Sequence, residues 1–320
     1  MKTISASDLI RVLDPLAIVN ALDDAFRSSI VAPLRHHHTM ARVGEPDAIL
    51  LAMPAWTDQS HGGTEEAVIG VKLVTVVPGN GARGLTGVMG SYVLMSGVTG
   101  APLAILDGTT LTHLRTAAAS ALAARYLART ESSRLLAVGS GALMPHLIKA
   151  HTSVRPITYL TIWARDSAKA DAMARSLAAL NLDIRVVSDL DRAVGEADIV
   201  TCATMSMTPL VHGEWLKPGT HVDLVGAYTP AMREADDEAI RRARVYVDTM
   251  EGATHEAGDI VQPLKSGVLT TDAIVGDLFA LANGRAQART SATEITLFKS
   301  VGTALEDLAA AKLAYDRVMN

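Results

Sequence analysis

The chain has 320 residues, 49% hydrophobic and 20% charged, which predicts an ordinary globular protein of about two domains. Its 29 basic and 34 acidic residues give a formal net charge of −5, and neither sign forms a long run, so neither nucleic acid nor a membrane is expected as a partner. A single cysteine, Cys202, excludes an intramolecular disulfide, and the charged N-terminal stretch is unlike a signal peptide, so we expect a cytoplasmic protein.

The first part of the chain predicts one helix followed by strands. Residues 5–30 carry apolar side chains at helical spacing, and Ser5 or Ser7 can cap the helix that they predict. Short apolar runs separated by Gly, Pro and Asn then predict strands at 48–56, 67–78 and 88–95 and a hairpin over 96–108.

The alanine-rich segment 109–128 predicts a second helix. Its cap candidates are Thr109 and Thr110, and Asp107 is expected to be a cap or turn residue. Beyond this helix, strands alternate with helices over 134–151, 157–180, 183–204, 220–228 and 244–253. This alternation predicts a parallel, doubly wound sheet. Residues 293–319 predict one long amphipathic helix that folds back onto the first domain.

These elements predict an α/β fold in two domains. Residues 115–293 are expected to form a Rossmann-type domain around the doubly wound sheet. Residues 1–114 and 294–320 are expected to form a discontinuous α+β domain, because the last helix returns to the first part of the chain.

A glycine turn follows the first strand of the Rossmann-type domain. Gly139 and Gly141 stand in VGSGAL, between an apolar run and a predicted helix. The first glycine allows the tight turn, and the second lets a pyrophosphate approach the N–H groups at the helix N-terminus. Ala142 belongs to the same loop, and Met144 takes the position of a third glycine, which governs helix packing more than ligand contact. The loop predicts a dinucleotide site.

The end of the next strand indicates which dinucleotide is bound. A site for NAD places Asp or Glu there, to bind the ribose 2′-hydroxyl. This sequence has Arg165, followed by Ser167 and Lys169, and an arginine can hold a 2′-phosphate through paired N–H groups. Asp166 lies one residue late and can compete. A surface arginine on a loop is the alternative interpretation. We predict NADPH as the cofactor, with NADH as the alternative.

Six stretches together carry a resemblance to a known family that covers nearly the whole chain. They are GVKLVTVVPGN (70–80), LAILDGTTLTHLRTAAASALAA (103–124), VGSGA (138–142), ADIVTCAT (197–204), WLKPGTHVDLVGA (215–227) and LFKSVGTALEDLAAA (297–311). The chain resembles the ornithine cyclodeaminase/mu-crystallin family. The resemblance implies a two-domain, usually homodimeric enzyme whose Rossmann domain binds a nicotinamide cofactor and whose other domain supplies substrate contacts and dimerisation. The family's activities include ornithine cyclisation with loss of ammonia, alanine dehydrogenation and reduction of cyclic ketimine carboxylates.

The resemblance assigns substrate contacts to three basic residues. Arg35 in PLRHHH and Arg115 in LRTAA match carboxylate-binding arginines, and Lys72 in GVKLV matches a lysine that reaches the substrate. Arginine can clamp a carboxylate with paired N–H donors, which would aim C2 of a small imino acid at the nicotinamide. The neighbouring positive charges would lower the pKa of Lys72 and let it exchange a proton. From pattern alone, Arg115 is an ordinary solvated residue and Lys72 a strand-edge charge.

Further cofactor contacts are expected where the resemblance matches later parts of the chain, at Thr204, Gly226, Ala227, Lys299 and Gly302. Glu306 and Asp307 in ALEDLAAA are weaker polar candidates beside this motif. The group His255, Glu256 and Asp259 contains metal-ligand types, but no second ligand cluster accompanies it, so no metal is predicted.

One departure from the family pattern separates the possible activities. Cyclodeaminases and related alanine dehydrogenases have an aspartate two residues after the first glycine of this strand end, where this chain has Tyr228. A tyrosine with a pKa near ~10 is neutral at pH 7 and cannot pair with an ammonium as a carboxylate does. We therefore expect a reductase of the cyclic imino acid Δ1-pyrroline-2-carboxylate, and of the six-membered piperideine analogue, with Tyr228 near the ring nitrogen or packed on the nicotinamide. An ornithine cyclodeaminase, an alanine-type dehydrogenase and a non-enzymatic ligand-binding protein are the alternatives.

Three consecutive histidines follow Arg35. If this stretch is a strand, Arg35 and His37 share one face, and His36 and His38 share the other. A strand cannot aim all three at one metal ion. His37 is therefore predicted as a neighbour of the substrate and a candidate proton donor. His36 and His38 are expected to serve packing or the dimer interface.

Overall fold

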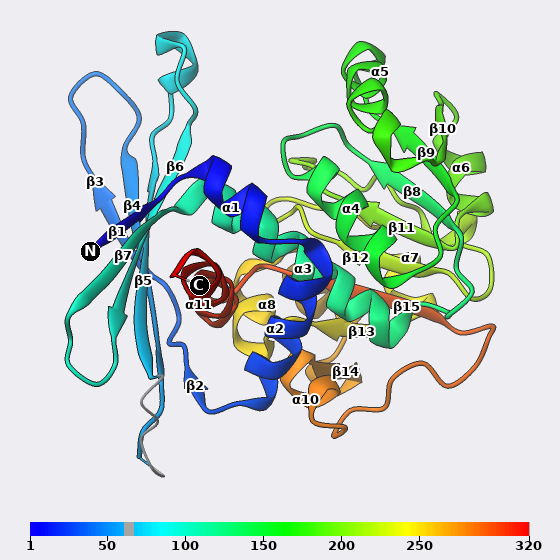
Figure 1. The fold of residues 1–320 in the computed structure, drawn as a ribbon. Coiled ribbons are helices and arrows are strands. Elements are labelled where there is room, and N and C mark those ends of the chain that lie inside the picture. The colour runs from blue at the N-terminus through cyan, green and yellow to red at the C-terminus, as the bar shows by residue number, and fades with distance from the viewer. Residues whose placement is uncertain (61–66, 320) are drawn as a thin grey trace. The chain divides into compact units, whose positions relative to one another are not determined.

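The computed structural model describes residues 1–60 and 67–319, which divide into two compact units (Figure 1). Unit 1 comprises Met1–Arg115 and Thr303–Asn320, and unit 2 comprises Thr116–Gly302. The division near the C-terminus falls after Gly302 rather than before Glu294. The reason is that strand β15 (Ile295–Lys299) pairs with strands β12 and β13 of unit 2.

Unit 1 is built on a seven-stranded sheet in the order β1-β7-β6-β5-β4-β2, with β3 paired to β4. Its strands are β1 (Lys2–Ile4), β2 (Ile30–Val31), β3 (His36–Met40), β4 (Ala48–Thr57), β5 (Val68–Val76), β6 (Val88–Ser96) and β7 (Pro102–Asp107). The four longer strands from β4 to β7 pair antiparallel, and β1 joins parallel to β7. The strands expected from the sequence and the hairpin of β6 and β7 are confirmed.

The helices of this unit begin where a side chain can cap them. They are α1 (Ala6–Val12), α2 (Pro15–Arg27), the first part of α3 (Gly108–Leu127) and α11 (Ala304–Met319). The single helix expected over 5–30 is wrong. Pro15 begins a new helix, and the Asp14 side chain caps it by accepting from the Ala17 N–H at 2.9 Å.

Helices α1 and α3 are each capped at the N-terminus by one side chain. Ser5 caps α1, as one of the two predicted candidates. At α3 neither predicted threonine is the cap. Asp107 is, because its Oδ1 accepts from the Thr110 N–H at 2.7 Å, and Thr109 Oγ1 instead accepts from the Gly90 N–H.

Helix α11 packs against one face of the unit 1 sheet, as Figure 1 shows beside β5. Along β5 the side chains alternate, so Lys72 and Val74 are buried while Leu73 is exposed. A Cβ added at Gly70 would meet the Leu308 side chain of α11, which shows that the Gly70–Lys72–Val74 face is the one that α11 covers.

Unit 2 contains an eight-stranded sheet in the order β10-β9-β8-β11-β12-β15-β13-β14, and every pair in it is parallel. Besides β15, its strands are β8 (Arg134–Val138), β9 (Tyr159–Trp163), β10 (Asp183–Val186), β11 (Ile199–Cys202), β12 (His221–Leu224), β13 (Ala243–Val247) and β14 (Ile274–Asp277). The predicted doubly wound sheet is confirmed. The strand order reverses between β8 and β11, and the carboxyl ends at such a point are where open α/β sheets bind ligands.

Helices connect most of these strands. They are the end of α3, α4 (Met144–Val154), α5 (Ser167–Ser176), α6 (Leu190–Glu196), α7 (Asp237–Arg242), α8 (Met250–Glu256), α9 (Gly258–Ser266) and α10 (Leu278–Ala282). The helix expected over 293–319 is wrong in its first part. That part is the buried strand β15, and the chain turns at Gly302, which has a φ of +82°, before α11 begins.

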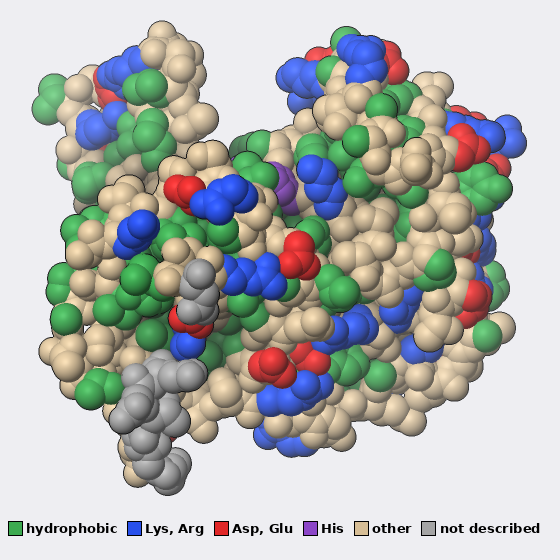
Figure 2. All heavy atoms as spheres, in the orientation of Figure 1, with side chains coloured by type: hydrophobic (Ala, Val, Ile, Leu, Met, Phe, Trp, Pro, Cys, Tyr) green, Lys and Arg blue, Asp and Glu red, His purple; other side chains and the backbone are tan. Residues whose placement is uncertain are grey.

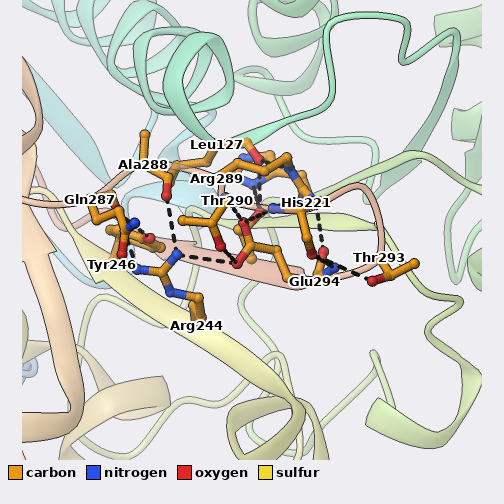
Figure 3. Close-up of polar contacts among 12 residues, drawn as sticks. Leu127, His221, Arg244, Tyr246, Gln287, Ala288, Arg289, Thr290, Thr293 and Glu294 are labelled. Atoms are coloured by element: carbon orange, nitrogen blue, oxygen red, sulfur yellow. Dashed lines mark hydrogen bonds and ion pairs between the residues drawn. The ribbon is translucent and has the colours of Figure 1, made fainter.

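Residues 287–294 before β15 are held by main-chain and side-chain hydrogen bonds (Figure 3). Arg289 donates from Nη1 to the Glu294 carbonyl oxygen and from Nε to the Leu127 carbonyl oxygen, both at 2.6 Å. Arg244 Nη1 donates to Glu294 Oε2 at 3.2 Å. These contacts fix the entry to β15, which carries Lys299 at its other end.

On the face drawn in Figure 2, basic and acidic side chains are interspersed. None of the helices in the described part of the chain is long and apolar enough to cross a bilayer.

Candidate active site

Unit 1 contains a buried cluster of four charged side chains, Lys72, Arg115, Glu306 and Asp307, which we call the unit 1 cluster. Lys72 lies in β5, Arg115 in α3, and the two acids in the first turn of α11. The Lys72 Nζ lies 2.9 Å from Asp307 Oδ1 and 2.8 Å from Oδ2. Arg115 donates from Nε to Asp307 Oδ1 at 2.9 Å and from Nη1 to Glu306 Oε2 at 2.7 Å. Asp307 thus bridges the two predicted cationic residues.

Burial controls the proton affinity of this cluster. Lys72 is only 2% exposed and Arg115 only 4%. Burial, together with the charge of Arg115, lowers the pKa of Lys72 to about 8, although Asp307 opposes the shift. Burial alone would raise the pKa of Asp307, but Arg115 and Lys72 hold it below its usual value. The cluster therefore contains two basic and two acidic side chains, and the pKa of Lys72 within it is about 8.

Tyr92 closes one side of this cluster. It pairs across the sheet with Lys72 and is fully buried. Burial raises the pKa of its phenol well above the usual value, so the phenol stays neutral. Its hydroxyl has no hydrogen-bond partner within residues 1–60 and 67–319. A Cβ at Gly70 would collide with that hydroxyl, so only glycine fits there.

Arg35 and the three histidines lie at the start of β3. Arg35 is partly buried, and its charge also lowers the pKa of Lys72, which puts its charge within electrostatic range of the lysine. His36, His37 and His38 occupy β3 as the predicted strand, and all three are exposed. The structure therefore brings Arg35 into the field of Lys72 and leaves His37 on the open part of the strand.

The glycine turn in unit 2 has the shape that a dinucleotide site requires. Gly139 directly follows β8 and has a φ of +116°, and a Cβ there would collide with the Ala203 carbonyl oxygen. At Gly141 a Cβ would meet nothing within 4 Å, and both Gly141 and Ala142 are exposed. Met144 is buried at the start of α4, in keeping with a packing role. The turn leaves exposed backbone ahead of a helix N-terminus, and these residues fit a bound pyrophosphate.

The residues after β9 differ in their contacts and exposure. Asp166 caps α5 by accepting from the Lys169 N–H at 3.3 Å, so its carboxylate serves the helix. The side chains of Arg165, Ser167 and Lys169 are exposed at this strand end.

Three residues that were predicted to contact the cofactor, Thr204, Gly226 and Lys299, bond to buried groups inside unit 2. Lys299 is fully buried, donates to the Gly226 carbonyl oxygen and pairs with Asp259 Oδ2 at 3.1 Å. The Thr204 hydroxyl donates to Glu234 Oε1 at 2.7 Å. We call Glu234, Asp259 and Lys299 the unit 2 cluster.

The remaining predicted residues lie on the turns beside that cluster. Ala227 has a left-handed φ of +49°, and Tyr228 after it is 49% exposed. The Gly302 N–H donates to Asp248 Oδ2 at 2.6 Å, so this glycine is anchored to the strand next to β15. Of the group that contained metal-ligand types, His255 bonds to the Glu251 carbonyl oxygen of its own helix.

The sequence model of the Ornithine cyclodeaminase/mu-crystallin family matches residues 7–320. The chain belongs to this family. The predicted membership is confirmed.

One relative and two solved structures are similar to this chain over most of their length. The Δ(1)-pyrroline-2-carboxylate reductase of Paracoccus denitrificans is 40% identical over 280 residues, which cover 87% of this chain and 88% of the relative. The Thermococcus litoralis Δ(1)-pyrroline-2-carboxylate reductase in complex with NADH and L-proline has a TM-score of 0.91 and 33% identity, covering 100% of this chain and 98% of the other. An archaeal alanine dehydrogenase dimer with bound NAD has a TM-score of 0.89 and 29% identity, with 100% and 96% covered.

The sequence did not show what Glu306 and Asp307 pair with in this family member, and it gave no sign of Glu234. Glu306 and Asp307 were visible in ALEDLAAA, but only the fold shows that they pair with Lys72 and Arg115, more than 190 residues away. Glu234 had no sequence signal, because it follows an irregular segment and reaches Thr204 only through the packing of unit 2.

Proposed function

We propose that this protein is an NAD(P)H-dependent reductase that converts Δ1-pyrroline-2-carboxylate to L-proline, with the piperideine analogue as a second substrate. The observation that carries the proposal is the buried Lys72, with a pKa of about 8, beside Arg115 and in the field of Arg35. Such a group can give up a proton near neutral pH next to cations that bind a carboxylate. The names of the similar reductases support the choice of substrate.

The proposed roles in unit 1 follow from the contacts. Arg115 uses two N–H groups on the α11 carboxylates, out of the five N–H donors that a guanidinium carries. Its remaining donors, with Arg35, are proposed to hold the substrate carboxylate, while Asp307 fixes the direction of both Arg115 and Lys72. Reduction of C=N needs a hydride at C2 and a proton at nitrogen, and Lys72 is proposed to supply that proton. A bound reduced nicotinamide would supply the hydride.

The proposed roles in unit 2 concern the cofactor. Gly139, Gly141 and Ala142 are proposed to hold the pyrophosphate. Arg165, helped by Ser167 and Lys169, is proposed to favour NADPH over NADH. The similar structures contain NADH or NAD, which supports a nicotinamide cofactor and leaves the 2′-phosphate preference to experiment.

We also propose that the protein forms a homodimer in the cytoplasm. The face of the unit 1 sheet away from α11 exposes large apolar side chains, including Trp56 on β4, Leu73 on β5 and Met89 on β6. Apolar sheet faces of this kind mark association surfaces in soluble proteins. The dimeric archaeal dehydrogenase supports the dimer, and the buried free thiol of Cys202 fits a reducing compartment.

The test mixes the protein with NADPH or NADH and Δ1-pyrroline-2-carboxylate and follows loss of the reduced-nicotinamide absorbance. The matched control is Δ1-pyrroline-5-carboxylate, an isomer whose carboxylate is not attached to the imine carbon. We expect oxidation with the 2-carboxylate and little with the control. The absence of oxidation with both cofactors would overturn the proposal.

Two further assays distinguish the proposed reductase from a cyclodeaminase and from an alanine-type dehydrogenase. Ammonia released from ornithine without net cofactor turnover would indicate a cyclodeaminase. Oxidation of the reduced cofactor that requires pyruvate and free ammonia would indicate an alanine-type dehydrogenase. Tyr228, in the position of the family's aspartate, predicts that both assays are negative.

A further inference from the structure

The unit 2 cluster lies at the carboxyl ends of three neighbouring strands. Thr204 follows β11, Gly226 follows β12, and Lys299 is the last residue of β15. Glu234 Oε1 accepts from the Thr204 N–H at 2.6 Å and from its hydroxyl at 2.7 Å. Asp259 Oδ1 accepts from the Glu234 N–H at 2.8 Å, so the two acids are joined. Together these side chains tie the three strand ends to one another.

The turn that follows β12 depends on this support. A Cβ at Gly226 would collide with both the Thr204 carbonyl oxygen and Glu234 Oε1, so the turn lies directly on the cluster. Ala227 then adopts a φ of +49°, in the left-handed region that residues with a side chain rarely occupy. Such a conformation persists when its surroundings over-determine it. Tyr228 is exposed immediately after it.

The charges of the cluster are not balanced. Glu234, Asp259 and Lys299 are all fully buried, which puts two carboxyl groups against one ammonium. The other groups around Glu234 are Thr204 and Cys202, and burial raises the pKa of the Cys202 thiol so that it stays neutral. One added proton makes the cluster neutral. The geometry places that proton on Glu234, because Asp259 Oδ2 pairs with the Lys299 ammonium, whereas Glu234 Oε2 has no hydrogen-bond partner in the described part of the chain.

We propose that Glu234, Asp259 and Lys299 are positioning residues that hold the turn Gly226–Tyr228 in its cofactor-binding form, and that they do so fully only while Glu234 carries a proton. The proposal rests on the proposed function in one respect, since it takes this strand edge as the dinucleotide site. Burial raises the pKa of Glu234 to about 7, with Asp259 adding to the shift and Lys299 opposing it. Cofactor affinity should therefore fall as the pH rises through 7.

The raised pKa of Glu234 also makes the stability of the fold depend on pH. Glu234 has a usual pKa of 4.5 and a folded value of about 7, so between these values the folded state binds more protons than the unfolded state. The Glu234 contribution to stability therefore declines as the pH rises from about 4.5 to 7 and is constant above that range.

The first experiment measures NADH affinity from pH 6 to 9 by fluorescence for the wild type, Glu234→Gln and the control Glu238→Gln. Glutamine keeps the oxygen that accepts from Thr204 and cannot ionise. We expect Glu234→Gln to match the wild type at pH 6 and to keep its affinity at pH 8, where the wild type weakens several-fold. Glu238 is a partly exposed glutamate on α7 paired with Arg241, and its variant should follow the wild type. Identical pH profiles for all three proteins would overturn the proposal.

A second readout does not depend on the cofactor. The melting temperature of the wild type should fall relative to that of Glu234→Gln between pH 5 and 7.5, and Glu238→Gln should show no such divergence. A protein that fails to bind NADH or NADPH would overturn the proposed function, while this melting comparison would still decide the role of Glu234. Parallel melting curves of wild type and Glu234→Gln would count against that role.

A rescue experiment tests positioning against general destabilisation. Lys299→Met removes the donor to the Gly226 carbonyl oxygen, and we expect NADH affinity to fall about tenfold or more. Adding Ala227→Gly should restore part of that affinity, because glycine adopts the left-handed conformation without a steric penalty. A double variant that binds no better than Lys299→Met would contradict a role of the cluster in holding this turn.

Discussion

The two units each bury a cluster of charged side chains, and the clusters differ in their balance of charge. The unit 1 cluster has two basic and two acidic side chains, whereas the unit 2 cluster has one basic and two acidic side chains. In the first, burial and Arg115 act on Lys72, whose pKa falls to about 8. In the second, burial and Asp259 act on Glu234, whose pKa rises to about 7. In both clusters burial is the largest cause of the shift, which lowers the pKa of a lysine in one cluster and raises the pKa of a glutamate in the other.

The two clusters also have different proposed roles. Lys72 of the unit 1 cluster lies beside cations that suit a substrate carboxylate, and its proposed role is to supply a proton to the substrate. Glu234 of the unit 2 cluster accepts a hydrogen bond from the main-chain N–H of Thr204, and its proposed role is to support the turn Gly226–Tyr228. Substitutions of single residues in and beside the unit 1 cluster test this difference between the two clusters.

The largest effect is expected from Arg115→Met, which leaves the two α11 carboxylates buried with Lys72 alone. Breaking a buried ion pair by removing one partner costs about 3–5 kcal/mol. Urea unfolding should show a loss of this size, and KM for the imino acid should rise in any folded protein. The control is Arg11→Met, which removes an exposed arginine paired with Asp8 and should change stability by less than about 1 kcal/mol. Equal, small losses in both variants would contradict the paired cluster.

An intermediate effect is expected from Asp307→Asn. The wild-type rate should fall as the pH rises through about 8, because Lys72 then loses its proton. Asparagine removes the negative charge that opposes this loss, so the fall should move to lower pH by about one unit. The pH dependence of kcat measures this shift. Glu306→Gln is the matched control, since Glu306 is the neighbouring acid and bonds to Arg115. A fall at the same pH in wild type and Asp307→Asn would remove Asp307 from the control of Lys72.

The smallest effect is expected from Tyr92→Phe. The Tyr92 hydroxyl is buried without a hydrogen-bond partner in the described chain, so its removal should leave stability within about 1 kcal/mol or raise it. Thermal unfolding measures the change. A loss of stability well above about 1 kcal/mol would mean that the Tyr92 hydroxyl stabilises the unit 1 cluster.

The parts of the site that local motifs encode could be predicted from the sequence. The turn at Gly139 and Gly141 needs only a strand, two glycines and a helix in succession, and the structure has that arrangement. The partners of Lys72 and Thr204 could not be predicted, because Asp307 and Glu234 reach them across 235 and 30 residues through the packing of separate elements.

The fold errors have local physical causes. Helical periodicity continues through Leu13 and Asp14, but Pro15 has no N–H, so the chain starts a new helix there. The apolar run before Lys299 suits either a helix or a buried strand, and its place in the sheet between β12 and β13 decides in favour of a strand. Helices α7 to α10 span only 5 to 9 residues each, too few to give a periodic signal.

The most direct test of the reductase follows the hydride itself. The protein would be incubated with NADPH deuterated on the transferred face at C4 and with Δ1-pyrroline-2-carboxylate, and the proline formed would be examined by mass spectrometry and NMR. We predict L-proline with one deuterium at its α-carbon. Proline without deuterium, or consumption of the imino acid without any proline, would contradict hydride reduction at C2.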